Sequence, residues 1–178
     1  MEPTALNGLT ACLGNMGVTM GTTTTVTITT AGTFAIRGKA YTSTAASNAA
    51  VTSFLDPNTG VAPIGVGPGK GCIFVACLVS TGTIATMRFV QSEIVDLQAN
   101  SAQYTAGAFA IAPEFPSIPN NLCPIGYFIV KVATDYTSGG THVFGTTSVA
   151  TGAMNSAATA YAVTATSVCT LPDRPQLS

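Results

Sequence analysis

The sequence predicts an all-β fold, an antiparallel β-sandwich of jelly-roll-like form with extended N- and C-terminal segments. About eight short stretches of the chain are rich in β-branched residues or alternate between apolar and polar residues. The 18 glycines and 10 prolines separate these stretches, and no stretch has a clear helical period. Short strands joined by Gly and Pro turns, without helices between them, are typical of a sandwich or a barrel.

The first predicted strands are residues 22–30 and 33–41. The earlier one reads TTTTVTITT, a β-branched run that favours a pleated sheet over a helix. The later one alternates in a way that predicts an inward orientation for Phe34 and Ile36. A turn at residues 31–32 separates the two runs, and we therefore expect them to pair as a hairpin.

Two of the later predicted strands, 72–79 and 125–132, are nearly continuous in Ile, Val, Phe, Leu and Cys. Such a run in a sheet indicates that both faces are covered. We expect one face to meet the core of the domain and the other to meet a second layer or a neighbouring subunit. The remaining predicted strands in this half of the chain are 83–90, 108–111 and 156–168.

Four prolines predict an extended segment that crosses between strands, because each fixes φ and removes a backbone donor. They are Pro113, Pro116, Pro119 and Pro124. Together, these elements predict a single domain over residues 21–170, preceded by an N-terminal arm at 1–20 and followed by a C-terminal tail at 171–178. We expect at least one of these two ends to dock on a partner chain.

Charge is scarce: six Lys/Arg and seven Asp/Glu make 7% of the 178 residues, where about 25% is usual. The net charge of −1 and the scattered cations argue against a nucleic-acid partner, which requires clustered Lys and Arg. Only Arg37 and Lys39 are close in sequence, and a strand would place both on one solvated face. A surface so poor in charge is more typical of a protein that packs against other protein subunits than of a free monomer.

The longest apolar run, residues 72–79, is far shorter than the roughly 20 residues that a membrane-spanning helix needs, so we expect no membrane partner. The first residues, MEPTAL, lack the basic region of a signal peptide. We therefore expect the chain to be made and assembled in the cytoplasm.

The five cysteines are irregularly spaced, odd in number, and lack the paired short gaps of a zinc site. We interpret them as small buried hydrophobic residues that form neither a disulfide framework nor a metal site. They are Cys12, Cys72, Cys77, Cys123 and Cys169.

No motif indicates an enzyme. His142 is the only histidine, and a hydrolytic triad would need it beside Asp135 and a serine, yet the chain has no Gly-x-Ser-x-Gly elbow. The glycine-rich loop 65–71 does not match a phosphate loop, because Ile64 and Gly71 stand where Gly and Ser/Thr are needed. We therefore assign no catalytic, cofactor-binding or metal-ligating residue, and no cofactor.

Three segments carry a resemblance to a known class of proteins. They are residues 34–41 (FAIRGKAY), residues 115–126 (FPSIPNNLCPIG) with the apolar strand after them, and residues 139–147 (GGTHVFGTT). In this order they resemble the small β-sandwich head proteins of tailed bacteriophages, the decoration or cement proteins of the capsid exterior. The resemblance implies a jelly-roll-like fold, a non-enzymatic role in the virion, and oligomers that clamp neighbouring subunits of the major capsid protein.

We therefore expect a structural virion protein that stabilises a phage head by bridging capsid subunits, as a homo-oligomer, most simply a trimer or a dimer. The alternative is a receptor- or glycan-binding module of a virion fibre or appendage, since jelly rolls also serve as lectins. The absence of Trp and the presence of only five Tyr weaken that alternative.

Overall fold

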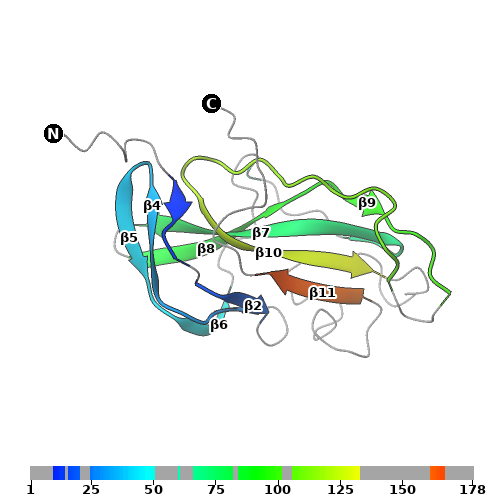
Figure 1. Cartoon of the computed structure of the whole chain (residues 1–178), viewed down its shortest axis with the longest axis horizontal. Coiled ribbons are helices and arrows are strands. Elements are labelled where there is room, and N and C mark those ends of the chain that lie inside the picture. Colours follow the sequence, from blue (N-terminus) through cyan, green and yellow to red (C-terminus); the bar gives the residue numbers. More distant parts are fainter. Residues whose placement is uncertain are drawn as a thin grey trace.

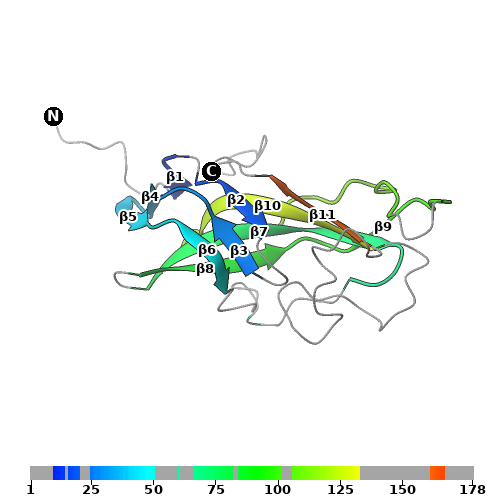
Figure 2. The same ribbon diagram turned by 90° about the horizontal axis from the view of Figure 1, so that it is seen from below.

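The computed structural model describes residues 10–14, 16–20, 25–50, 60, 66–81, 84–101, 106–132 and 161–166. Within these residues every regular element is a β-strand, every strand pair is antiparallel, and there is no helix (Figures 1 and 2). The predicted all-β, antiparallel class is thus confirmed for this part of the chain. None of these residues forms a helix that could cross a membrane.

The largest sheet has the strand order β11-β10-β7-β8, and β9 also pairs with β7 (Figure 1). We call it the large sheet. Its longest strand, β7, pairs with β10 along one edge and with β8 and β9 along the other. The strands are β7 (Lys70–Thr81), β8 (Ile84–Gln91), β9 (Val95–Asp96), β10 (Cys123–Val132) and β11 (Tyr161–Thr166).

A serine joins β8 to β9 along the edge of β7. The amide of Ser92 donates to the carbonyl of Ile73 at 2.8 Å, and its hydroxyl accepts from the amide of Ile73 at 2.8 Å. Phe74 pairs with Gln91 and Gly71 with Val95, so the β8–β9 stretch contains one residue more than β7. This is a β-bulge, in which Ser92 replaces backbone pairing that the extra residue interrupts.

The N-terminal strands form two three-stranded sheets, whose registers continue into each other. Backbone bonds from Leu13 to Thr33, from Thr29 to Gly17 and from Thr30 to Met16, each 3.0 Å, connect the two pairings. The two sheets are therefore halves of one bent three-stranded meander. They have the orders β1 (Ala11–Cys12), β4 (Gly32–Ile36), β5 (Lys39–Ser43) and β2 (Val18–Met20), β3 (Thr25–Ile28), β6 (Ala46–Ala50).

The predicted hairpin around residues 31–32 is wrong. β3 and β4 do not pair with each other; the chain runs from one into the other, and both pair with the β1–β2 stretch. The predicted strand 33–41 instead breaks at Arg37 and Gly38, where φ is 51° and 77°. Positive φ at both central residues defines a type I′ turn, whose twist suits a two-residue hairpin. Arginine is an uncommon first residue for this turn, so sequence alone did not reveal it.

One apolar cluster contains residues from all three sheets. Phe34 and Ile36 are buried in it, as predicted. Phe34 stacks on Tyr41 with ring centroids 5.6 Å apart, and Phe89 packs on Phe128 at 5.9 Å. The cluster comprises Met16, Val18, Ile28, Phe34, Ile36, Val66, Cys72, Phe74, Ala76, Leu78, Phe89, Cys123, Ile125, Phe128, Val130 and Val132.

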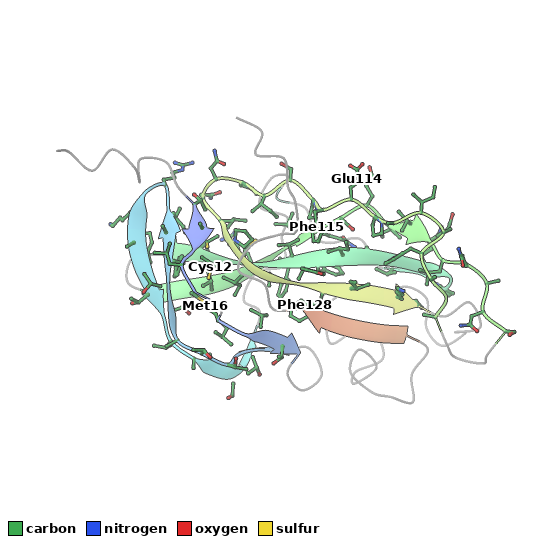
Figure 3. The ribbon with its side chains drawn as sticks, viewed as in Figure 1. Cys12, Met16, Glu114, Phe115 and Phe128 are labelled. Atoms are coloured by element: carbon green, nitrogen blue, oxygen red, sulfur yellow. The ribbon has the colours of Figure 1, made fainter. Side chains whose placement is uncertain are left out.

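Residues 10–14 and 16–20 of the predicted N-terminal arm contribute β1 and β2 to the meander. Met16 and Val18 are fully buried in the three-sheet cluster, and Figure 3 shows Met16 between the meander and the large sheet. This part of the chain is therefore packed within its own fold. The C-terminal tail 171–178 lies outside the described residues.

The opposite face of β7 is covered by residues 106–122, the crossing segment. Every residue from Cys72 to Leu78 is buried, so the prediction that this strand is covered on both faces is confirmed. The cover comes from the same chain: Ile73, Val75 and Cys77 cluster with residues of the crossing segment, namely Phe115, Ile118 and Leu122.

Two predictions near the crossing segment need correction. Residues 108–111 form no strand: Phe109 makes one isolated bridge to Leu97, and the chain bends directly after it. Pro124 belongs to β10 and not to the crossing segment. The register between β10 and β7 shifts by one residue between Pro124 and Gly126, and such a bulge is where a strand accommodates proline.

Truncating Phe74 or Phe128 to Ala is expected to lower the free energy of unfolding by about 3–5 kcal/mol, because each ring is fully buried and leaves a cavity. Urea denaturation measures this. Thr33→Ala, at an exposed position of β4, is the control and should change stability by less than about 0.5 kcal/mol. Equal effects at the buried and exposed positions would contradict the assignment of the core.

Gly71→Ala is expected to destabilise the fold by about 1–3 kcal/mol, as overpacking does. A Cβ atom there would lie 2.8 Å from the carbonyl oxygen of Val130 and 2.7 Å from the ring of Phe109. Gly14→Ala is the matched control, because a Cβ at that position meets nothing within 4 Å. Thermal unfolding of the two variants side by side tests the close approach, and equal melting temperatures would refute it.

Candidate interaction surface

The sequence predicts no catalytic, cofactor-binding or metal-ligating residue. Across the described residues, no group of three or more His, Cys, Asp or Glu side chains could hold a metal ion. His142 and Asp135, the two residues of the hypothetical triad, lie outside the described residues.

The glycine-rich loop ends in an ion pair. Lys70 Nζ lies 2.6 Å from Asp96 Oδ1, and both side chains are largely exposed. The loop leads directly into strand β7, whereas a phosphate loop leads into a helix whose N-terminus binds the anion. Lys70 and Gly71 belong to β7, and the ion pair of Lys70 joins the start of β7 to β9. Val66, in the same glycine-rich segment, is fully buried.

Three cysteines are buried, as predicted: Cys72, Cys77 and Cys123 are fully buried. Cys12 is half-buried, and its thiol donates to the carbonyl of Gly14 at 2.7 Å. Burial raises the pKa of the Cys72 thiol to about 12 from its ordinary value of 9.0, and a hydrogen bond from Gln91 offsets part of that increase. Cys169 lies outside the described residues.

The crossing segment presents alternate side chains to the sheet and to the surface. Phe115 meets Tyr127 edge to face with ring centroids 5.1 Å apart, whereas Glu114 beside it is exposed. Figure 3 shows Phe115 directed toward the large sheet and Glu114 directed away from it. Ile111, three residues before Glu114, is 77% exposed.

A second surface feature lies at the turn between β4 and β5. The amide of Arg37 donates to the hydroxyl of Thr10 at 3.1 Å, and that hydroxyl donates to the carbonyl of Asn120 at 2.8 Å. Arg37 and Lys39 flank Gly38 and are both exposed. Leu13 is 56% exposed and lies farther from this turn, where its amide donates to the carbonyl of Thr33. We call Arg37 and Lys39 the basic patch.

The described part of the chain has few exposed charges, and most of them have no ion-pair partner. Lys70 and Asp96 form an ion pair, so among the described exposed residues the charges without an ion-pair partner are Arg37, Lys39, Glu93 and Glu114. Lys131 is partly buried, with its ammonium group 4.7 Å from the ring centroid of Phe109. The described surface thus carries two free cations and two free carboxylates, and the cations are together at one turn.

The basic patch and Glu114 lie on different parts of the fold. The basic patch lies at the turn between β4 and β5, which are at one end in Figure 1, and Figure 3 shows Glu114 part-way along the crossing segment. Leu13 and Ile111 are the exposed large hydrophobic residues of the described part of the chain.

The sequence predicts only part of this surface. It identifies Arg37 and Lys39 as neighbouring cations, but on one extended strand and not around a turn. It does not single out Leu13, Ile111 or Glu114. The Arg-Gly dipeptide between two alternating apolar runs was the one signal that could have revealed the turn.

Comparison of this chain with protein-family models, with curated proteins and with solved structures finds no match.

Raising the pH above 9 is expected to destabilise the fold through Cys72. Its thiol stays neutral in the folded state up to about pH 12, whereas in the unfolded chain it ionises near pH 9. The contribution is therefore fully present below pH 9 and is lost at about 1.4 kcal/mol per pH unit as the pH rises toward 12. Urea denaturation at pH 8 to 11 should show a steeper decline for the wild type than for Cys72→Ala; parallel declines would contradict this.

Proposed function

We propose that this chain is a structural virion protein of the capsid decoration or cement class, which binds the exterior of a phage head and bridges its subunits. The proposal includes a jelly-roll-like β-sandwich fold and a homo-oligomeric state, trimer or dimer. It assigns no enzymatic activity to the chain. The observation that carries it is the scarcity of charge, which is 7% of the chain.

A surface poor in charge suits a protein that remains bound to other protein subunits. A free monomer keeps a charged exterior for solubility, whereas the centres of protein interfaces are depleted in charge. The exposed positions of the described strands and turns are mostly Thr, Ser, Ala, Asn and Gln, which can pack closely and still form hydrogen bonds. Broad contacts with a shell of many identical subunits would use such a surface.

The state of the cysteines supports assembly in a reducing compartment. Three of the four described cysteines are buried, where oxidants have little access. A virion protein made and assembled in the host cytoplasm has no need of disulfides. The support for stability comes instead from the apolar clusters on both faces of β7.

The glycan-binding alternative finds less support. Shallow sugar sites use aromatic faces beside polar groups. Among the residues whose burial the structure describes, no aromatic residue is fully exposed: Phe34, Phe74, Phe89 and Phe128 are buried, and Tyr41, Phe109, Phe115 and Tyr127 are partly buried.

Binding to assembled heads tests the proposal. The purified chain is mixed with heads of the phage that encodes it, assembled without this protein, and with unassembled major capsid protein. We expect saturable co-sedimentation with heads, much weaker binding to the unassembled subunit, and a higher melting temperature of the heads, because binding to the assembled state alone stabilises it. Failure to bind heads, with the chain folded, would refute the proposed function, and selective retention on a glycan array would favour the alternative.

A further inference from the structure

We propose that β5 is a dimerisation edge, which pairs with β5 of a second copy in antiparallel orientation about a two-fold axis at Thr42. The groups that recognise the partner are the backbone N–H and C=O groups of an extended strand. This inference rests on the self-association that the proposed function includes, and not on capsid binding. It commits that self-association to a dimer.

Strands β5 and β6 lie at an open edge of the meander. In the described part of the chain they pair with β4 and β3 respectively, and no strand pairs with their other side. Figure 1 shows β5 at the outer end of the fold. Ala40, Thr42, Thr44 and Ala45 are exposed, so solvent reaches this edge. An open edge presents a row of unpaired backbone groups that can bind another strand.

The turn between β4 and β5 determines which backbone groups face the open edge. A type I′ turn joins its first and fourth residues by a hydrogen bond, so Ile36 and Lys39 are a hydrogen-bonded pair. Opposite residues of an antiparallel ladder alternate between hydrogen-bonded and non-hydrogen-bonded pairs. Ala40 and Thr42 therefore belong to the second kind, and their N–H and C=O groups point away from β4.

The features that usually protect an edge strand are few on β5. Such features are charged side chains, prolines and bulges. All five residues of β5 pair with β4 without a register shift. No charged residue and no proline occurs from residue 40 to residue 50, and Lys39 is the one charge at the start of the strand. This edge is therefore regular, uncharged over most of its length, and open.

A second copy of the same strand fits this edge. Antiparallel pairing about Thr42 places Thr42 opposite the second copy's Thr42 and Ala40 opposite its Thr44, so that the outward backbone groups face each other. These side chains are small, and Thr–Thr pairs are favourable across antiparallel strands. Lys39 would lie opposite the second copy's Ala45, which keeps the two cations apart. Parallel pairing in register would place them side by side.

Thr42→Pro in the full-length chain tests the backbone contact. Proline removes an N–H that points away from β4, and an edge strand tolerates proline at such a position. Sedimentation velocity should show a wild-type dimer and at least tenfold weaker dimerisation of Thr42→Pro, with circular dichroism as the check that the variant is folded. A folded variant that dimerises as the wild type does would contradict the proposal.

Charges at Thr42 test the two-fold axis itself. Thr42→Lys and Thr42→Glu each place like charges opposite each other, so each variant alone should dimerise at least tenfold more weakly than the wild type. An equimolar mixture places Lys opposite Glu and should recover dimers that contain one copy of each variant. Thr33→Lys and Thr33→Glu are the matched controls and should dimerise normally, because Thr33 is exposed and faces Thr42 from β4, one strand away from the edge.

Four outcomes would overturn the proposal. They are a wild type that is a monomer or a trimer, charged Thr42 variants that dimerise as the wild type does, a mixture that fails to recover dimers, and Thr33 variants that weaken dimerisation as the Thr42 variants do. None of these measurements involves heads, so their failure is distinct from failure of the proposed function. Head binding by a folded, monomeric Thr42 variant would separate the two further.

Discussion

The structure depends on the burial of β7 on both faces. A strand that is apolar on both sides cannot lie at the surface, so each side needs its own cover. The three-stranded N-terminal meander supplies residues to one face, and the Pro-rich crossing segment covers the other. Both covers come from the same chain, so neither face of β7 needs a neighbouring subunit to bury its apolar side chains.

This constraint decides where the surface features lie. The crossing segment follows the face of the large sheet with Phe115 and Leu122 inward, and this orientation exposes Glu114. The meander bends to follow the core, and its β4–β5 turn is tied to the crossing segment through Thr10 and Asn120. The basic patch and Glu114 therefore lie on the two covers of the same strand, and a change in the packing of either cover would move one relative to the other.

Because this protein has few charges, each unpaired charge has a larger effect on which partner surface can bind. In a surface with many ions, one carboxylate contributes little to the choice of a partner, because many others screen or compete with it. Here the described surface has two free cations at one turn and two free carboxylates elsewhere. Apolar and small polar contact would supply most of the area of an interface, and these few charges would determine its orientation.

The sequence by itself determined the class of the fold, the positions of most strands, the inward faces of Phe34 and Ile36, the double burial of 72–78 and the burial of three cysteines. These follow from side-chain preference and local period, which act over a few residues. The sequence also shows that the cations Arg37 and Lys39 are close together. Only the tertiary structure decided that β3 runs into β4, that residues 10–14 and 16–20 belong to the meander, and that Arg37 stands at a turn. Strand pairing joins residues far apart in sequence, and a strand carries the same local pattern whichever neighbour it meets, so its partner is chosen by the packing of the whole chain.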